Sequence, residues 1–530
     1  MIYKKKLHVW LPLLFSLTMV IGMMLGYRMR DTMPGKQFFS IDKTSPLQEL
    51  TDLLKNKYVD DVNVNELADT AIAAILSKLD PHTVFIPADE VQGANEDIAG
   101  NFFGIGVEFT IIDDTINIMY VIPDGPSFKA GIQTGDQFIK VNDSIAAGKK
   151  MTPARIKKLL RGNNGTKVTV DILRGSQRKS ITIQRGIIPV SSVDAAYLIS
   201  GHIGYIRLNK FSKITYREFM EALEKLKKQG LQKLILDLRG NGGGVLDQAA
   251  EVADEFLDGD KLITYTEGKH FPKKEYRCKR EGLFEKGALV LLADEGTASA
   301  SEILIGALQD WNRATIVGRR SFGKGLVQEQ YSLSDGSALR LTVARYFTPT
   351  GRSIQRPYAN GEKAYYDEIT KRFHGGEVIN KDSVRNDTSK IFKTKGGKIV
   401  YGGGGISPDI FVPIDTARYG ITTSKLYMKG TLSDFAYTFY LQNRNKIHVY
   451  KTPGHFNGGF ILSDESWDRF TSMAGKDSVN MDKINNREKE DIGLMIKASI
   501  ARQMWRNPGF YEVMNSKDDA VKKAMEIISQ

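Results

Sequence analysis

Cysteine is almost absent from this chain: Cys278 is the only one among 530 residues. An intrachain disulfide is therefore excluded. Arg277, Lys279 and Arg280 surround this thiol and would favour its reactive thiolate form. We nevertheless interpret Cys278 as an ordinary cysteine in a charged loop, without a nucleophilic role. The sequence likewise indicates no metal site and no cofactor.

Long runs of one charge are also missing. Lysine and arginine together number 74 and aspartate and glutamate 62, which leaves an excess of 12 positive charges. This excess is spread along the chain, and the longest basic run is Lys4–Lys6. A nucleic-acid-binding surface usually shows a denser basic patch, so we expect no nucleic-acid partner.

Only one segment is apolar for long enough to matter to a membrane. Val9–Gly26 is almost wholly apolar and about 18 residues long, close to the minimum for a spanning helix. Lys4–Lys6 precedes it, and Arg28 and Arg30 follow where a cleavable signal would have small residues. We predict an uncleaved anchor over residues 1–30, with its N-terminus inside and the bulk of the chain outside the cytoplasm. A cleaved signal is the alternative.

The length indicates several domains. Residues 31–44 are interpreted as a linker, and residues 45–99 as a helical part with leucines and alanines at helical spacing. The turn Asp80-Pro81-His82 is expected to end its second helix. No internal repeat is evident.

Residues 100–188 change to short β-like runs punctuated by glycine. Thr152 followed by Pro153 predicts the start of a helix that runs to Leu160. The segment resembles a PDZ domain, a module that captures a peptide C-terminus as an added strand. The resemblance implies that backbone N–H groups of one glycine loop bind the terminal carboxylate. That loop comprises Gly104, Ile105, Gly106 and Val107. The alternative is a β-rich module whose glycines only make turns.

Residues 189–414 alternate strand and helix and predict an α/β core. Residues 357–400 are polar and glycine-bearing, and we expect them to form an inserted surface loop. Residues 415–530 are helical and charged with scattered aromatics, and we interpret them as a separate helical extension.

Two turns in the core carry the chemistry. Ser299 follows a buried strand and small residues and precedes an apolar helix, whose N-terminal dipole favours a developing oxyanion. Lys324 follows a second strand between two glycines. As a base it needs its pKa lowered from about 10.4 toward roughly 7–8, which burial could supply. The alternative is that Ser299 only caps a helix and Lys324 is a surface lysine.

Further residues complete this arrangement. The Ala300 N–H is one candidate oxyanion donor, and an N–H from the loop Gly242–Gly244 is the other. Gln328 lies four residues beyond Lys324 and could orient its amine through the amide oxygen.

Two glycine motifs suggest other functions and fail in detail. Gly318–Gly325 almost matches a phosphate-binding loop, but Gly325 replaces the serine or threonine that would hold magnesium. Arg239–Gly244 lies between a strand and a helix but lacks the glycine spacing of a dinucleotide site.

Several motifs together resemble the C-terminal processing peptidases, also called tail-specific proteases. They occur in the family's order over roughly residues 45–412, with the PDZ-like segment in place. They are Leu79–Thr83, Asp237–Gly244, Ala298–Glu302, Phe322–Gln328, Thr348–Gln355 and Ile406–Asp409.

The resemblance implies a serine endopeptidase with a Ser–Lys dyad on a ClpP/crotonase-like core and an inserted PDZ domain. It places the nucleophile on Ser299, the base on Lys324 and its partner on Gln328. The oxyanion donors fall on Ala300 and Gly243. Three features depart from the family: Thr297 replaces a usual serine, Gly242 replaces a common proline, and neither residues 357–400 nor the C-terminal extension has a family role.

With the predicted anchor, the resemblance implies a single-pass protein of a bacterial inner membrane with a periplasmic catalytic part. Secretion to the periplasm after signal cleavage is the alternative. Its partners would be protein substrates bound by their C-termini, and self-association stays open. A catalytically inactive, membrane-tethered PDZ scaffold is the second function class. A Ser–His hydrolase is the third, but none of the seven histidines lies in a comparable turn, and His82 is expected to pack or cap.

Overall fold

The structure is a computed structural model that describes residues 3–32, 46–148, 151–385, 387, 389–415, 420–482 and 484–530. It divides into two units, residues 1–74 and 75–530. The first contains α1 (Tyr3–Thr32), α2 (Pro46–Lys57) and most of α3 (Val64–Leu76). Within α1, Trp10–Tyr27 has a mean hydropathy of 1.7 and is long enough to cross a membrane. Most of the predicted linker 31–44 lies outside the described residues.

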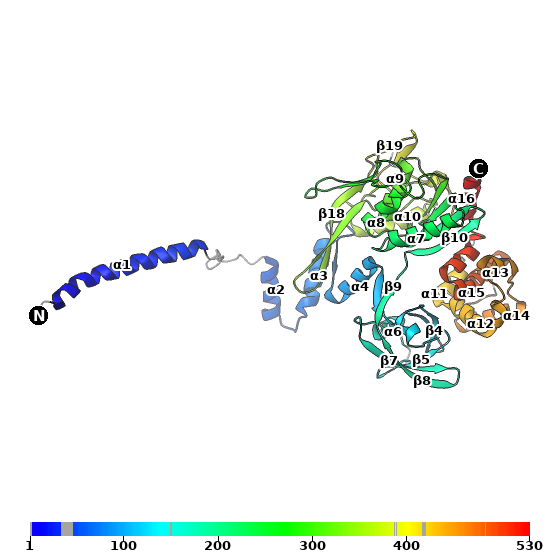
Figure 1. Cartoon of the computed structure of the whole chain (residues 1–530), viewed down its shortest axis with the longest axis horizontal. Coiled ribbons are helices and arrows are strands. Elements are labelled where there is room, and N and C mark those ends of the chain that lie inside the picture. The colour runs from blue at the N-terminus through cyan, green and yellow to red at the C-terminus, as the bar shows by residue number, and fades with distance from the viewer. Residues whose placement is uncertain are drawn as a thin grey trace. The chain divides into compact units, whose positions relative to one another are not determined.

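The second unit is built around a six-stranded sheet that runs parallel except for its first strand, β10 (Figure 1). In spatial order its strands are β10 (Val193–Ser200), β11 (Ile203–Leu208), β12 (Lys233–Asp237), β15 (Leu289–Ala293), β16 (Thr315–Gly318) and β21 (Ile410–Phe411). The central strands are apolar over nearly their whole length because helices cover both faces.

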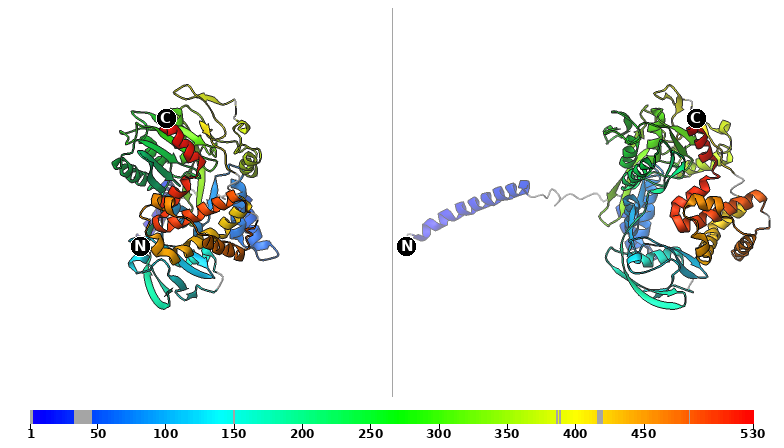
Figure 2. Two further views of the ribbon diagram at one scale, coloured as in Figure 1. Left: turned by 90° about the vertical axis from the view of Figure 1, so that its right-hand side faces the viewer. Right: turned by 45° about the vertical axis from the view of Figure 1, so that its right-hand side comes forward.

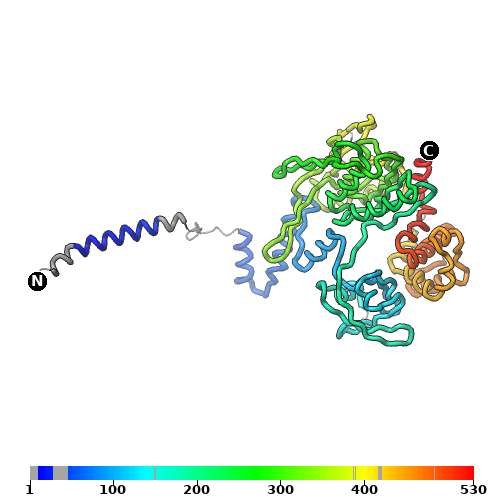
Figure 3. Tube along the Cα trace, in the orientation of Figure 1, coloured from blue at the N-terminus to red at the C-terminus, as the bar shows by residue number. Residues whose placement is uncertain are grey.

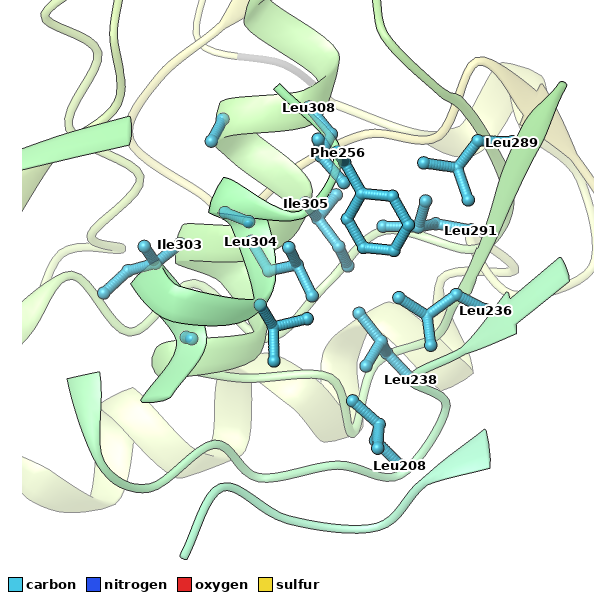
Figure 4. Close-up of a cluster of buried hydrophobic side chains, with 14 of the residues drawn as sticks. Leu208, Leu236, Leu238, Phe256, Leu289, Leu291, Ile303, Leu304, Ile305 and Leu308 are labelled. Carbon is cyan, nitrogen blue, oxygen red and sulfur yellow. The ribbon is translucent and has the colours of Figure 1, made fainter. Parts of the chain in front are cut away.

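One face of this sheet packs against α7 (Thr215–Lys228), α8 (Leu246–Asp254) and α9 (Ala300–Asp310). Figure 4 shows leucines of the strands facing Phe256 and the apolar side chains of α9. Every residue of α9 is buried, so this helix has no solvent face. The N-terminus of α9 is therefore held rigidly at the carboxyl end of the sheet.

The opposite face packs against the last helix, α16 (Asp519–Ser529). Alternate strand residues such as Ile235 and Leu292 contact Val521 and Ala524 in one cluster. The sequence predicted that the helices after residue 414 form a separate extension. Helix α16 differs from that prediction, because it packs on the sheet and completes its core. Its apolar residues are spaced to fill the face that α7–α9 leave open.

A second, five-stranded antiparallel sheet lies beside the first. Its strands are β1 (Val84–Ile86), β18 (Ala338–Phe347), β13 (Leu262–Glu267), β14 (Lys274–Arg277) and β17 (Leu326–Ser332), which pairs with β18. α4 (Ala88–Ala99) follows β1 and leads to the β-rich domain. Between β18 and β21 lies the segment predicted as a surface loop. It contains α10 (Glu362–His374), η1 (Lys381–Ser383), β19 (Ile391–Lys393) and β20 (Ile399–Tyr401), and it buries Tyr365 and Arg372.

The β-rich domain joins the core through a two-stranded ribbon, which the chain trace passes through twice (Figure 3). The ribbon pairs β2 (Asn101–Gly104) with β9 (Gly186–Pro189). The domain's sheet contains β3 (Val107–Ile112), β4 (Thr115–Val121), β5 (Gln137–Val141), β6 (Ser144–Ile145), β7 (Lys167–Arg174) and β8 (Gln177–Gln184). α5 (Pro126–Lys129) and α6 (Pro153–Leu160) flank it. The Thr152 hydroxyl accepts the Arg155 N–H, so the predicted helix start is confirmed.

The C-terminal helices before α16 form their own apolar core. They are α11 (Ile421–Lys429), α12 (Thr431–Ile447), α13 (Pro453–Gly459), α14 (Asp464–Lys476) and α15 (Asn486–Asn515). These orange and red helices contact the β-rich domain and the core sheet (Figure 2). On the β-rich domain, Thr110 donates to Asp434 at 2.5 Å, and Arg506 pairs with Glu108. The mixed α/β fold with helical parts at both ends was predicted.

Candidate active site

Ser299 lies in a sharp turn between β15 and α9. Its φ of 56° and ψ of −116° are unusual for any residue other than glycine. Such a conformation costs of order 1–3 kcal/mol and persists only where the surroundings impose it. Here the preceding residues are fixed: Thr297 donates to the Leu238 carbonyl at 2.9 Å, and the Ala298 N–H donates to the Asn241 carbonyl at 3.0 Å.

Glu302 connects the serine turn to the lysine loop. Its side chain is buried and accepts the N–H groups of Ser299 at 2.9 Å, Gly323 at 2.7 Å and Lys324 at 2.9 Å. The Ser321 hydroxyl donates to the same carboxylate. Burial raises the pKa of Glu302, and these hydrogen bonds act in the opposite direction. The capping-box spacing from Ser299 to Glu302 is a sequence signal that could have identified this residue.

Tyr346 makes a second connection between the same two segments. Its buried hydroxyl lies 2.8 Å from the Lys324 carbonyl and 3.2 Å from the Ser299 carbonyl. One hydroxyl carries one proton, so the two carbonyls share it. Together Glu302 and Tyr346 fix the backbones of Ser299 and Lys324 from both the N–H and the carbonyl side.

Lys324 ends the loop after β16 and precedes β17. Its Nζ donates to Gln328 Oε1 at 2.9 Å. Burial and, next, the charge of Arg340 lower the pKa of Lys324 to about 8, while Asp80 and Glu302 oppose the shift. Burial was the expected cause. The contribution of Arg340 was missed, because nothing near Lys324 in the sequence points to a residue of β18.

Gln328 is held by the turn that precedes β1. Its Nε2 donates to the His82 carbonyl at 2.7 Å. Asp80 stabilises this turn by accepting the N–H groups of His82 and Thr83. His82 therefore supports the lysine's partner through its backbone. Burial and the charge of Lys324 lower the pKa of the His82 imidazole to about 4.

One cavity of about 450 Å³ contains all five predicted catalytic and oxyanion residues. It is lined by Ser299, Ala300, Lys324, Gln328 and Gly243 together with Ile98, Gly242, Gly244, Val245, Leu246, Ile303, Leu326, Val327, Arg340 and Tyr346. Within the part of the chain that the structure describes, no hydrogen bond joins the Ser299 hydroxyl to the Lys324 amine. Catalytic hydrogen bonds often shorten only when substrate is bound.

The glycine loop touches the serine turn directly. Gly243 has a φ of +92°, and a Cβ there would lie 2.6 Å from the Ala298 carbonyl oxygen and 2.7 Å from the Ala300 nitrogen. Its own N–H donates to Asn241 Oδ1 at 2.9 Å. Ala300, as the first residue of α9, has an N–H without an intrahelical acceptor. Gly243 thus permits the close approach, while its N–H is engaged in this structure.

Three segments of this chain match known protein families. Residues 202–360 match peptidase family S41, residues 104–184 match the PDZ domain, and residues 422–506 match a family of unknown function. A probable CtpA-like serine protease of Staphylococcus epidermidis (strain ATCC 12228 / FDA PCI 1200) is 33% identical over 378 residues, covering 69% of this chain and 75% of that protein. The chain belongs to peptidase family S41. It is a serine protease with a PDZ domain, and the predicted family and enzyme class are confirmed.

Other relatives of this S41 peptidase are similar over most of their length. The carboxy-terminal-processing protease of Bartonella bacilliformis (strain ATCC 35685 / KC583 / Herrer 020/F12,63) is 36% identical over 336 residues, which cover 62% of this chain and 76% of that protein. Among solved structures, the photosystem II D1 C-terminal processing protease matches with a TM-score of 0.36 and 26% identity. That match covers 70% of this chain and 88% of the other.

In the PDZ domain of this S41 peptidase, the loop predicted to bind peptide lies between β2 and β3. Gly104 ends β2, Val107 begins β3, and Gly106 has a φ of +75°. The Ile105 carbonyl accepts the Ser127 N–H and the Gly106 carbonyl accepts the Ile122 N–H. β3 lies at one end of the strand order, so among the described residues one of its edges has no neighbouring strand. Such an edge can accept an added peptide strand.

Proposed function

We propose that this S41 peptidase hydrolyses peptide bonds with Ser299 as nucleophile and Lys324 as general base. The neutral Lys324 amine takes the hydroxyl proton as Ser299 Oγ bonds to the scissile carbonyl carbon. The resulting ammonium returns that proton to the leaving amine when the carbon–nitrogen bond breaks. Water, deprotonated by the same amine, then attacks the acyl carbon, and the ammonium returns that proton to Ser299 Oγ as the carbon–oxygen bond breaks. Gln328 holds the amine through the hydrogen bond from Lys324 Nζ.

The observation that carries this proposal is that Ser299 and Lys324 line the same cavity, Ser299 in a strained turn and Lys324 partly buried. A lysine with a pKa of about 8 is partly neutral at neutral pH, as a general base must be. The alternative of an inactive PDZ scaffold receives no support from this geometry, because Ser299, Lys324 and Gln328 are all present in it.

For the tetrahedral oxyanion, the proposed donors are the Ala300 N–H and an N–H of the glycine loop. Ala300 lies at the N-terminus of α9, whose dipole favours negative charge. Gly243 can act as the second donor only if its N–H leaves Asn241. Gly242 and Gly244 lie on either side of it and also line the cavity, so each offers another N–H.

The PDZ domain is proposed to select substrates by their C-termini. The terminal carboxylate would bind the loop Gly104–Val107, and the preceding residues would pair with the free edge of β3. The apolar groove walls would come from Ile105, Val107 and Leu159. Ile105 is buried and the other two are partly buried.

The protease is proposed to be a single-pass protein of a bacterial inner membrane, anchored by Trp10–Tyr27, with its catalytic part in the periplasm. Cleavage of the segment as a signal is the alternative, and it would leave a soluble periplasmic protein. Washed membranes should retain the catalytic part if the segment is an anchor. Protease added to intact spheroplasts should then degrade that part. Full protection in intact spheroplasts would mean that the topology is reversed.

The catalytic test uses the full chain in detergent and a fluorogenic peptide that ends in apolar residues with a free carboxylate. Ser299→Ala and Lys324→Ala should each lower turnover by a factor on the order of 10³ or more. Lys324→Arg should be as inactive as Lys324→Ala, because arginine does not deprotonate. Near-wild-type turnover by either lysine variant would rule out Lys324 as the base.

A further inference from the structure

Helix α10, in the segment between β18 and β21, packs beside the proposed base. Its Tyr365 is buried and meets the His82 ring edge-on, with ring centres 5.3 Å apart. The Arg356 guanidinium lies between Tyr365, at 3.8 Å from that ring's centre, and Phe322, at 4.0 Å. Phe322 belongs to the loop that carries Lys324. The segment therefore contacts both the loop of the base and the turn of His82.

Two sets of hydrogen bonds, joined through the covalent frame of His82, connect α10 to the lysine amine. The Tyr365 hydroxyl and His82 Nε2 are 2.9 Å apart. The His82 carbonyl accepts from Gln328 Nε2 at 2.7 Å, and Gln328 Oε1 accepts from Lys324 Nζ at 2.9 Å. Because Nε2 of the amide faces a carbonyl, its oxygen must face the lysine. The His82 carbonyl thus fixes which way round Gln328 presents its amide, and Tyr365 holds the side chain of the residue that carries this carbonyl.

This orientation matters for a neutral lysine. A neutral amine that donates one N–H to Gln328 has its lone pair directed away from that bond, where a hydroxyl proton can be taken. If Gln328 were free to rotate, its NH₂ group could face the amine and the lone pair would be occupied. The hydrogen bond from Tyr365 reaches the amine by way of His82 and Gln328.

Two further contacts hold the segment against the lysine loop. Arg372 of α10 donates to the Ser321 carbonyl at 2.8 Å. Arg320 of the loop makes a two-pronged ion pair with Glu377, at 2.6 Å for each bond. Buried, two-pronged pairs of this kind are geometrically demanding. The segment is therefore docked on the core at several points around residues 320–324.

We infer that Tyr365 and His82 are positioning residues that orient Gln328, and through it Lys324, so that residues 357–400 control the geometry of the base. This inference rests on the proposed function, in which Lys324 is the base. It assigns to the inserted segment a part in catalysis that needs no contact with substrate.

The test compares Tyr365→Phe with Tyr358→Phe, a partly exposed tyrosine of the same segment whose hydroxyl accepts from Arg345 Nη2 at 3.1 Å. Tyr365→Phe should lower kcat about tenfold with little change in KM, the scale for losing one hydrogen bond. It should also move the acidic limb of the rate profile to higher pH, because a loosened Gln328 admits water to the amine. Tyr358→Phe should match the wild type in both measurements.

A double-mutant cycle separates positioning from general destabilisation. In a Gln328→Ala background, Tyr365→Phe should have no further effect on kcat, because both changes remove the same orientation. If Tyr365→Phe folds poorly, His82→Asn provides a second test. It keeps the backbone carbonyl and loses the ring, and it should show the same fall in kcat and the same shift in the pH profile. Additive effects in the cycle, or a wild-type kcat and pH profile for Tyr365→Phe, would overturn the inference.

Labelling distinguishes failure of the inference from failure of the dyad. The reactivity of Lys324 toward acetic anhydride as a function of pH, followed by mass spectrometry, reports its state without turnover. If Lys324→Ala stays active, the proposed function fails. The labelling profile of Tyr365→Phe still shows whether α10 controls the lysine, and an unchanged profile would overturn that control.

Discussion

Glu302 and Lys324 are joined by a hydrogen bond that does not involve the lysine side chain: the Lys324 backbone N–H donates to Glu302 Oε2 at 2.9 Å. The same oxygen accepts the Ser299 N–H. A single buried carboxylate thus sets the relative position of the proposed nucleophile and base. The segments that carry Ser299 and Lys324 follow two neighbouring strands, β15 and β16. The Glu302 carboxylate therefore joins them at the carboxyl edge of the sheet.

Glu302→Gln should lower both activity and stability. The amide turns a donor toward backbone N–H groups, which leaves some of them without an acceptor and costs about 2 kcal/mol in the free energy of unfolding. The resulting misplacement should reduce kcat by on the order of 10²-fold. Thermal unfolding and peptide turnover measure the two effects.

The pH profile of Glu302→Gln gives a further check. The negative charge of Glu302 raises the pKa of Lys324, so its removal should move the acidic limb to lower pH even as kcat falls. Glu329→Gln, an exposed carboxylate beside Gln328, serves as the control and should leave the limb in place. A limb that moves to higher pH would contradict the assigned charge of Glu302.

Activity of the wild type should rise with pH up to about 8 and then level off, because only the neutral Lys324 accepts a proton. Arg340→Gln removes a positive charge that lowers this pKa, so the midpoint should move to higher pH. Arg345→Gln changes an exposed arginine on the same strand and should not shift it. Identical midpoints for Arg340→Gln and the wild type would show that burial alone lowers the pKa.

The strain at Ser299 should be visible in stability. Ser299→Gly relieves a φ of 56°, whereas Ser299→Ala keeps it. We expect the glycine variant to be more stable than the alanine variant by about 1 kcal/mol, after allowing for the greater freedom of glycine in the unfolded chain. Both should be inactive. Denaturant unfolding decides the order, and a less stable glycine variant would argue against strain at this turn.

Neighbouring glycines of the oxyanion loop should respond differently to alanine. At Gly243 the added Cβ would overlap the Ala298 carbonyl oxygen and the Ala300 nitrogen, and φ is +92°. Gly243→Ala should therefore reduce turnover by at least about 10². At Gly242 no heavy atom lies within 4 Å of the added Cβ, so Gly242→Ala should fold normally and keep most of its activity. Equal losses at the two positions would contradict the close approach of Gly243 to the serine turn.

Substrate selection by the PDZ domain predicts a dependence on the terminal carboxylate. Amidating the C-terminus of one peptide should weaken its binding or cleavage by about 1–3 kcal/mol, the scale for a charge-assisted hydrogen-bonding group. Fluorescence titration and turnover with matched peptides measure this. Equal cleavage of the free acid and the amide would exclude carboxylate recognition as the selecting step.

Local patterns in the sequence were sufficient for much of the fold. Leu289–Ala293 is a continuous apolar run and forms a buried parallel strand, and the Thr152-Pro153 pair starts α6 as predicted. Each signal can be recognised within a few consecutive residues, although the strand itself pairs with distant segments. Local patterns also predicted Ser299 at the N-terminus of α9 and Lys324 just before β17, and the structure has both residues there.

What the sequence did not predict depends on contacts between distant segments. Arg340, Tyr346 and the His82 carbonyl reach the site from elements far from Ser299 or Lys324, and no periodicity encodes such pairs. The inserted segment seemed a loop because its charged residues are numerous. Several of those charges, such as Arg372, are buried and paired against the core. The polar composition of the segment therefore gave no sign that helix α10 packs against the core.

The C-terminal helices and a bound peptide would both contact strand β3, the helices through its side chains and the peptide along its edge. Glu108 and Thr110 point from β3 toward α15 and α12, while the free edge of β3 is where a peptide strand would pair. By thermodynamic reciprocity, any factor by which these helices change peptide affinity is the factor by which peptide changes their docking. An excised PDZ domain would report peptide affinity without this coupling. The difference in peptide-binding free energy between the excised domain and the intact chain would measure the coupling between peptide binding and helix docking.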